Sequence, residues 1–412
     1  MGIKNLNFLI EKYSPAAINY KYLCVYEYKY IAIDISIYLY KFIYRNGDAL
    51  ELLAKQVMRL LKNRVIPVYI FDGKPPNEKS DVLNERRNIK KESLLKQEKI
   101  KEIIKIKEEL KKGDRNEQNE KIIEIEEKIN EEIKIINIIE NKLNNIEKET
   151  EAATETEINE YINEYGEMLM GYEIEDLMEE LEKLKKNMII IDKKVIDDCK
   201  KLLTNMGIPY IVANGEAEAL CARLIQKGYV MACLSEDMDI LANGGKLFLR
   251  NFNENNNKVL EYDLDKILKN FEMDYNQFVD LCILCKCDYT TTITNIGRER
   301  AYTFIKKYKT IENIIDFIKT DGMDRYIVPN DFDYINARRL FLTCGENENF
   351  EELKKKMRLS KPVINKVIEM LEDKSKINTI KDIKINLEKF HNNLYESLYG
   401  KEKSILSYMN AF

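Results

Sequence analysis

The chain has 412 residues, of which 45% are hydrophobic, so it is long enough to bury a sizeable core in two or three domains. It has neither the roughly 18 to 20 uninterrupted apolar residues of a membrane span nor an N-terminal basic stretch before an apolar block, so we expect a globular protein that is neither membrane-anchored nor secreted. The net charge of −5 says little about partners, because residues 79–112 are rich in Lys and Arg whereas residues 147–182 are rich in Asp and Glu.

The cysteines and the single histidine narrow the possible chemistry. Most of the eight cysteines fall in apolar runs, as small buried hydrophobic residues do in a reducing compartment. Cys282, Cys285 and Cys287 lack a fourth zinc ligand nearby, and His391 is remote in the sequence, so the pattern disfavours a zinc site. Having one histidine also removes most histidine-based catalysis. We expect His391 to be an ordinary polar residue of the C-terminal tail.

Strand-like and helix-like segments alternate in the first part of the chain. Residues 28–40 and 65–72 are runs of β-branched and aromatic residues of strand length, and residues 49–63 and 197–206 have helical periodicity. This alternation predicts the α/β class, with a mostly parallel central sheet flanked by helices.

The middle of the chain predicts long helices. Residues 80–190 contain no strand signal, and charged residues alternate there with Ile and Leu at spacings of three and four. The apolar stripe between Ile122 and Leu143 is typical of packing against a partner helix rather than of ligand binding. Gly113 and Asp114 indicate a turn, and residues 149–167 indicate a flexible link.

The last part of the chain is predicted to be mainly helical. Residues after 260 have helical character, which is interrupted at residues 295–297. The final 60 or so residues indicate amphipathic or frayed helix without catalytic content.

Seven carboxylates follow short apolar runs along the chain. Residues just beyond the carboxyl ends of parallel strands face a shared crevice, so we expect these side chains to gather. Several desolvated carboxylates repel one another unless cations compensate, and Mg²⁺ prefers oxygen ligands. Two such ions can clamp a phosphodiester and generate a hydroxide nucleophile, although the acids alone also fit phosphatase or polymerase chemistry. The seven residues are Asp34, Asp72, Glu216, Glu218, Asp237, Asp239 and Asp288.

Four of these acids form two close pairs, each with an alternative explanation. Glu216 and Glu218 stand at an apparent helix start, where they could simply be first-turn acids that suit the positive helix end. Asp237 and Asp239 follow an apolar strand and can face one side of it, or they could lie in a solvated loop. One pair is weak evidence, but two pairs together with the three other acids indicate a metal site.

Several long motifs carry a family resemblance. They occur in the family's order and together cover roughly residues 1–90 and 195–315. The sequence resembles the flap endonuclease family of structure-specific 5′ nucleases. The motifs are MGIKNL at the start, the AIDIS run, PVYIFDGKPP, MGIPYIVANGEAEALCA, SEDMDIL and FVDLCILCKCDY.

The resemblance implies an Mg²⁺-dependent enzyme that cuts 5′ flaps at junctions of single-stranded and duplex DNA with two metal ions. By motif, the seven acids become the metal ligands, with Asp34, Asp72, Glu216 and Asp237 among the catalytic residues. Lys79 and Arg86 match basic residues at the foot of a helical arch. Seven residues apart on one helix face, both can meet the scissile phosphate, although an ordinary solvated charged face is the alternative.

Further DNA contacts follow from the same resemblance. Gly2 becomes the N-terminus after removal of Met1, and in the family this end lies near the active site. Tyr40 matches an aromatic residue that stacks on a nucleotide near the cut, with buried packing as its alternative.

TITNIGRERA (292–301) corresponds to the family's helix-hairpin-helix segment, which contacts duplex phosphates with a K⁺ ion nearby. Asn295 stands where a first glycine is usual, but Asn tolerates left-handed geometry. Gly297, Arg298 and Arg300 remain, so duplex binding is expected to survive, although the two arginines could also be exposed helix charges.

The resemblance also implies an organisation along the chain, in which the arch is enlarged by a long helical insertion. The acidic part of the insertion, within residues 113–190, would repel phosphate, so we expect it to point away from the DNA, to contact a protein or to discourage wrong substrates. The expected boundaries are 1–80 and 191–275 for the two parts of the nuclease core, 81–190 for the arch with its insertion, 276–345 for the helix-hairpin-helix DNA-binding region and 346–412 for a helical tail.

The sequence also bears on partners and location. The tail KSILSYMNAF (403–412) has the aliphatic and aromatic character of a sliding-clamp motif but lacks its Gln and paired aromatics. We expect a monomer in the nucleus or in a viral replication compartment. A 5′-3′ exonuclease or bubble or junction nuclease with the same acids is the alternative, and a non-catalytic DNA-binding scaffold is the alternative from another class.

Overall fold

The computed structural model describes most of the chain outside its middle. The chain divides into two compact units. The first unit comprises residues 1–80 and 191–412, and the second comprises residues 81–190. In the second unit, Ile100, Ile103, Leu177 and Leu181 form a small buried cluster. The predicted stripe, turn and link of the insertion lie outside the described residues. The described residues are 3, 5–44, 48–74, 76–79, 93–101, 103–105, 107, 177, 178, 181, 191–253, 256–320, 325–343, 345–372 and 377–409.

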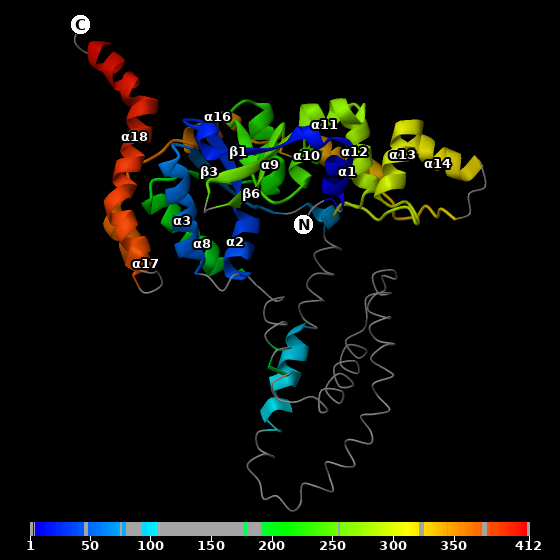
Figure 1. Cartoon of the computed structure of the whole chain (residues 1–412), viewed down its shortest axis with the longest axis horizontal. Helices are drawn as coiled ribbons and strands as arrows, with labels where there is room; N and C mark the ends of the chain where they lie inside the picture. The colour runs from blue at the N-terminus through cyan, green and yellow to red at the C-terminus, as the bar shows by residue number, and fades with distance from the viewer. Residues whose placement is uncertain are drawn as a thin grey trace, which may run out of the picture. The chain divides into compact units, whose positions relative to one another are not determined.

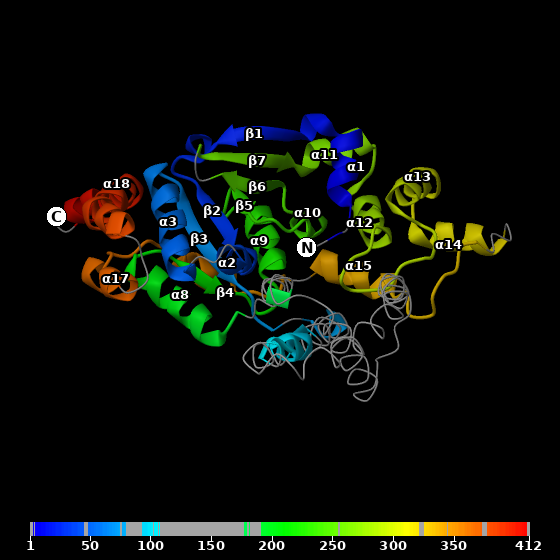
Figure 2. The same cartoon turned by 60° about the horizontal axis from the view of Figure 1, so that its bottom comes forward.

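The first unit (Figure 1) is built on a sheet of seven strands in the order β1-β7-β6-β5-β2-β3-β4, which can be followed in Figure 2. Five neighbouring strands, from β6 to β4, run parallel, and β7 pairs antiparallel with both β6 and β1. The predicted mostly parallel sheet is therefore confirmed. The strands are β1 (Ile18–Tyr22), β2 (Tyr30–Asp34), β3 (Ile66–Phe71), β4 (Tyr210–Val212), β5 (Ala232–Leu234), β6 (Leu247–Asn253) and β7 (Lys258–Asp263).

The strand predicted over residues 28–40 is too long. β2 ends at Asp34, and the α2 helix (Ile35–Tyr44) begins directly after it. The carboxylate of Asp34 accepts the backbone N–H of Ser36 at 3.1 Å, which fixes the turn from strand to helix. The apolar character of Ile35 to Leu39 reflects a buried helix, because buried helices and buried strands have the same composition over short runs.

Helices cover both faces of the sheet (Figure 2). On β2, Ile31 and Ile33 point to one hydrophobic cluster while Ala32 points to the other, as the two-residue period of a strand requires. One cluster includes α2, α3 (Ala49–Lys62), α8 (Lys193–Asn205), α17 (Ile364–Leu371) and α18 (Ile377–Met409). The other includes α1 (Leu6–Tyr13), α9 (Ala217–Gln226), α10 (Asp239–Ala242), α11 (Leu264–Phe271) and α12 (Tyr275–Leu284).

Four further helices of the first unit extend the second cluster beyond the sheet. They are α13 (Arg298–Tyr308), α14 (Ile311–Thr320), α15 (Tyr334–Thr343) and α16 (Phe350–Lys356), and the short 3-10 helices are η1 (Pro15–Ala17), η2 (Leu23–Tyr26) and η3 (Asn77–Lys79). In the described part of the chain, no helix combines the length and the apolar character needed to cross a membrane.

The C-terminal helices are more firmly packed than a frayed tail. Ile383, Leu387 and Leu394 of α18 are fully buried in the same cluster as α3. His391 is only 1% exposed, and its Nε2 lies 3.4 Å from the carbonyl oxygen of Gly207. His391 thus lies in the C-terminal tail as expected, and α18 packs its side chain against the core.

Candidate active site

Asp34 and Asp72 are joined at the carboxyl ends of two neighbouring parallel strands, β2 and β3. Ser36 donates its hydroxyl to Oδ2 of Asp72 at 2.5 Å, and its backbone N–H bonds to Oδ1 of Asp34. The other oxygen of Asp72 accepts the N–H of Ala217 at 2.8 Å. Asp72 is thus tied to both α2 and the N-terminus of α9.

Asp237 and Asp239 are connected to the same site through Ser235 at the end of β5. The Ser235 hydroxyl donates to Oδ2 of Asp34 at 2.9 Å and accepts the N–H of Asp237 at 3.1 Å. The N–H of Asp239 in turn bonds to Oδ1 of Asp237 at 3.0 Å. Oδ1 of Asp239 accepts the N–H of Ile3 at 2.8 Å, so the N-terminal segment reaches this site. Gly2 lies outside the described residues.

Lys79 connects the remaining three acids. Its Nζ forms an ion pair with Glu216 and lies 3.8 Å from Oε1 of Glu218 and 3.7 Å from Oδ2 of Asp288. Lys79, Glu216 and Glu218 are each at most 9% exposed. The structure therefore brings all seven predicted acids into one connected group, which we call the carboxylate cluster.

The start of α9 gives its two glutamates different positions. Glu216 is the N-cap residue, but its side chain makes no capping hydrogen bond, whereas Glu218 lies in the first turn. Instead of capping the helix, the Glu216 carboxylate meets Lys79 and accepts the hydroxyl of Tyr289 at 2.5 Å. First-turn acids would ordinarily stay solvated, so this arrangement favours a role in the site over the simple helix-end explanation.

Burial and mutual repulsion make three acids of the carboxylate cluster hard to ionise. Burial, with the nearby charge of Asp72, raises the pKa of Asp34 to about 8. Burial and Glu216 raise the pKa of Glu218, and burial and Asp237 raise the pKa of Asp239, both well above the ordinary carboxylate range. Such a group is stabilised by any cation that enters it.

Lys79 is one such cation. Burial alone lowers the pKa of its ammonium, but Glu218 and Glu216 outweigh that effect and raise it above its usual value. As the side chains stand, no three His, Cys, Asp or Glu residues among those described enclose a metal ion. The donors are nevertheless hard oxygens in negative surplus, which is the set that Mg²⁺ requires. The residues present therefore fit divalent ions.

Residues 292–301, predicted to form the helix-hairpin-helix segment, lead into α13. The backbone of Asn295 has a φ of 61°, a left-handed geometry that glycine adopts freely and that Asn tolerates. Gly297 is the N-cap residue of α13, and a Cβ on it would meet nothing within 4 Å. Arg300 donates to the carbonyl of Asn295 at 2.6 Å, and the Arg298 guanidinium lies 3.9 Å from the centre of the Phe8 ring. The backbone at Gly297 is thus open to a close approach.

The other predicted DNA contacts are placed only in part. Tyr40 is half-buried on α2, four residues after Ser36, so it shares the helix face that Ser36 presents to Asp72. Its two alternatives, stacking on a nucleotide and packing, remain open. Arg86 lies outside the described residues.

Several residues that hold the site were not found from the sequence. Ser36 and Ser235 bridge acids from neighbouring strands, Ile3 bonds to Asp239 through its backbone, and Tyr289 bonds to Glu216. A hydroxyl two residues from an acid was a weak signal for the serines. Tyr289 directly follows Asp288 in its motif, which was the only sequence signal for it.

Comparison with known proteins agrees with this geometry. Two family models match the chain, the XPG N-terminal domain over residues 1–93 and the XPG I-region over residues 207–288. Flap endonuclease 1 of Brugia malayi is 31% identical over 359 residues, which span 83% of this chain and 75% of that protein. Flap endonuclease 1-A of Sorghum bicolor is 30% identical over 372 residues, 86% of this chain and 78% of the other.

Solved structures share the fold at lower identity. Flap endonuclease-1 from Methanococcus jannaschii is 20% identical with a TM-score of 0.55, covering 95% of this chain and 99% of that one. The catalytic core of Rad2 in complex with a DNA substrate is 16% identical with a TM-score of 0.61, covering 94% of this chain and 100% of the other.

Fold, site and similarity together define the class. The sheet with acids at its carboxyl edge, together with the two matched domains, is that of the XPG-type structure-specific nucleases. Within that class, the chain belongs to the flap endonuclease family. It is therefore an enzyme that hydrolyses DNA phosphodiester bonds.

Proposed function

We propose that the protein is a structure-specific 5′ flap endonuclease of DNA replication and repair that cuts at the junction of single-stranded and duplex DNA with two Mg²⁺ ions. One observation carries this proposal. All seven acids expected from the family motifs lie in one connected group where the parallel strands end, and three of them pair with Lys79.

The seven acids of the carboxylate cluster would hold the two ions of the proposed metal site. When bound, the two ions would supply a hydroxide nucleophile and neutralise the leaving oxygen. The chain's own contribution is to hold these carboxylates in place: Ser36 and Ser235 each link Asp34 to another acid by hydrogen bonds.

Lys79 would act on the scissile phosphate. Its ammonium lies within 4 Å of three carboxylates, so it is close to where the phosphate must arrive. An entering phosphate would compete with Glu216 for this cation. Arg86 is proposed to assist it, and Tyr40 to stack on the nucleotide beside the cut.

Duplex binding is assigned to the helix-hairpin-helix segment. The open backbone at Gly297 at the start of α13 allows a phosphate to approach, with Arg298 and Arg300 on the same turn and a K⁺ ion proposed nearby. Gly2 is proposed to contact DNA, which is consistent with the bond from Ile3 to Asp239.

Other assignments rest on the family resemblance alone. We propose the boundaries 1–80, 81–190, 191–275, 276–345 and 346–412, a monomeric state, and a nuclear or viral replication setting. Sliding-clamp binding is proposed through residues 403–412, which have the aliphatic and aromatic character of the motif but lack its Gln and its paired aromatics.

The acidic insertion within residues 113–190 is proposed to face away from the threaded strand, to bind a protein or to discourage wrong substrates. Deletion of residues 115–185 that keeps the basic helices should change selectivity or partner binding. Unchanged cleavage, selectivity and partner binding would contradict all three roles.

Parallel cleavage assays test the proposed function. Labelled 5′-flap, nicked, bubble and four-way DNA would be compared at equal enzyme concentration, with Mg²⁺ and with EDTA. We expect the flap to be cut fastest and EDTA to abolish cutting. Preference for bubble, four-way or nicked DNA would favour a related exonuclease or junction nuclease, and no cleavage at all would favour a DNA-binding scaffold.

A further inference from the structure

Tyr289 makes a close contact with one metal-site acid. Its hydroxyl donates to Oε2 of Glu216 at 2.5 Å, and its side chain is only 6% exposed. Lys79 meets the other oxygen, Oε1, of the same carboxylate. Each oxygen of Glu216 therefore has one donor, and the two donors together set the orientation of the carboxylate.

Nothing in α9 itself fixes this carboxylate. Glu216 is the N-cap residue, yet its side chain makes no capping bond. Its backbone position is set by neighbours: Gly73 donates to the carbonyl of Gly215 at 2.8 Å, and Ala217 donates to Asp72. These bonds hold the main chain but leave the side-chain torsions to Lys79 and Tyr289.

The two donors differ in how firmly they are held. The ammonium of Lys79 is shared with Glu218 and Asp288, at distances of 3.8 and 3.7 Å, and it is the group proposed to leave for the phosphate. The Tyr289 hydroxyl makes its hydrogen bond to Glu216 alone among the contacts of the described residues, although its ring also faces the Lys79 ammonium at 5.7 Å from the ring centre. It is the donor that can stay on Glu216 while Lys79 moves.

The ring of Tyr289 rests on a rigid support. It packs edge-on against Phe341 of α15, with ring centres 5.0 Å apart, and Phe341 is fully buried. Arg223 of α9 donates to the carbonyls of Phe341 at 3.2 Å and Leu342 at 2.5 Å. A closed circuit of contacts therefore runs from α9 to the end of α15, through Tyr289, and back to Glu216 at the start of α9.

We propose that Tyr289 is a positioning residue that holds Glu216 in the orientation in which it receives a divalent ion. The inference rests on the proposed function and extends it: metal affinity would depend on Tyr289 as well as on the seven acids. Hydrogen-bond partners of metal ligands commonly change metal affinity about 10- to 100-fold when removed. Loss of this hydroxyl should have an effect of that size.

Tyr289→Phe removes the hydroxyl alone and keeps the ring. Mn²⁺ binding to the full-length protein without DNA, measured by electron paramagnetic resonance, should weaken about 10-fold or more. In cleavage assays the Mg²⁺ concentration for half-maximal rate should rise by a similar factor, while binding to flap DNA in EDTA stays unchanged.

Tyr26→Phe is the matched control. Tyr26 is 1% exposed, and its hydroxyl donates to Oε2 of Glu261 on β7 at 2.5 Å, the same bond type at the same length, with an acid that is not in the carboxylate cluster. Its Mn²⁺ binding should match the wild type. Phe341→Leu, which keeps the hydroxyl but removes the aromatic support, should weaken Mn²⁺ binding measurably but by less than about 10-fold. If Tyr289→Phe unfolds, unchanged Mn²⁺ binding in Phe341→Leu overturns the inference.

A double-mutant cycle with Glu216→Gln shows whether Tyr289 acts through Glu216. In that background, Tyr289→Phe should change residual Mn²⁺ binding less than about 2-fold, since its partner is already altered. Wild-type Mn²⁺ affinity in Tyr289→Phe, or a full loss that persists beside Glu216→Gln, would overturn the inference alone. A wild-type protein that neither binds Mn²⁺ nor cuts a flap would overturn the proposed function, and with it this inference.

Discussion

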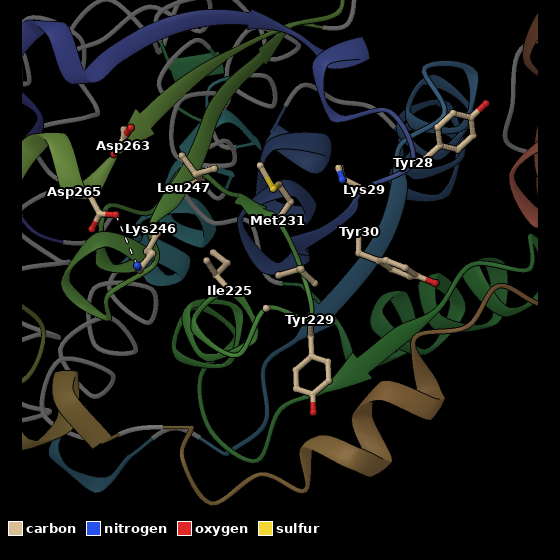
Figure 3. A pocket seen from close by; sticks show the side chains of 12 residues that line it. Tyr28, Lys29, Tyr30, Ile225, Tyr229, Met231, Lys246, Leu247, Asp263 and Asp265 are labelled. Atoms are coloured by element: carbon tan, nitrogen blue, oxygen red, sulfur yellow. Dashed lines mark ion pairs between the residues drawn. The ribbon is translucent and has the colours of Figure 1, made fainter. Parts of the chain in front are cut away.

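The two ends of the parallel strands have opposite characters. At the carboxyl ends of β2, β3 and β5, seven acids gather with Lys79 as the one basic side chain that the described contacts place among them. At the other ends lies a pocket of about 560 Å³, where the Lys246 ammonium is 3.7 Å from an oxygen of Asp265 (Figure 3). Positive and negative charges are balanced at the pocket end, whereas negative charge is in surplus at the end with the seven acids.

This contrast shows that the pocket of Figure 3 and the carboxylate cluster lie at opposite ends of the strands. The pocket is lined by Tyr30, Met231 and Leu247, at or next to the first residues of their strands, and by Asp263 at the end of antiparallel β7. Ligands of open α/β sheets bind beyond the carboxyl ends of the strands, where the carboxylate cluster lies. The strand starts serve packing: Tyr30 bonds to Tyr399 of α18 at 2.9 Å between their hydroxyl oxygens.

The largest effect is expected at the carboxyl ends. Asp72→Asn and Asp237→Asn each remove a carboxylate charge from the proposed metal site while keeping its shape. Cleavage of flap DNA should fall by roughly 10³-fold or more, since metal stabilisation of the transition state amounts to several kcal/mol. Single-turnover rates measure this, with DNA affinity in EDTA as the control. Retained cleavage in both variants would remove the acids from the mechanism.

Two lysine substitutions, one at each end of the strands, compare the two ends directly. Lys79→Met removes the buried cation among the acids, whereas Lys266→Met removes an exposed one that pairs with Asp263 at 2.9 Å beside the pocket. Cleavage should fall about 10²- to 10³-fold for Lys79→Met, as when a positioned electrostatic donor is lost. Mg²⁺ should also raise the melting temperature of Lys79→Met more than that of wild type, because the ion then neutralises uncompensated acids. Lys266→Met should match wild type in both measurements, and equal behaviour of the two variants would contradict the contrast.

The pH dependence of stability tests whether the start of β4 serves packing alone, because His391 contacts Gly207 just before that strand. Burial lowers the pKa of this imidazole below its ordinary value, so its contribution to stability is present above pH about 6.5 and is lost as the pH falls. Thermal unfolding should therefore show wild type losing more stability than His391→Gln between pH 7 and pH 5.5. Cleavage at pH 7.5 should be the same in both. The chain has one histidine, so its NMR titration is a direct check, and a pKa at or above 6.5 would sink this prediction.

The smallest effect is expected in the pocket itself. Met231→Ala and Lys246→Ala alter its lining without touching the carboxylate cluster. Flap cleavage should change less than about 2-fold in either variant, as for most surface substitutions away from a special feature. A loss approaching that of Asp72→Asn would show that the pocket end takes part in catalysis.

Much of the fold and the acid set could be predicted from the sequence. Strand runs ending in Asp34 and Asp72 identified the parallel sheet and its functional edge, because composition and strand direction are local signals. The sequence did not predict the antiparallel strands β6 and β7 or the edge strand β1. β7 is only half-buried, and its pairing partners are not set by local composition.

Other parts of the site could not have been read from local pattern. The bond from Tyr289 to Glu216 joins residues 73 positions apart, and that from Ile3 to Asp239 joins residues 236 apart. Such contacts exist only once the sheet and its covering helices have assembled. His391 is likewise buried only because α18 docks on the core, and the charged sequence of α18 does not reveal that docking.

Anomalous diffraction from crystals soaked in Mn²⁺ tests the central claim most directly. We predict two peaks about 3.5 to 4 Å apart among the seven carboxylates, the separation typical of two-metal sites, with Glu216 turned toward one of them. The pocket of Figure 3 should show none. Absence of any peak among the acids at saturating Mn²⁺, or peaks confined to the pocket, would contradict the account.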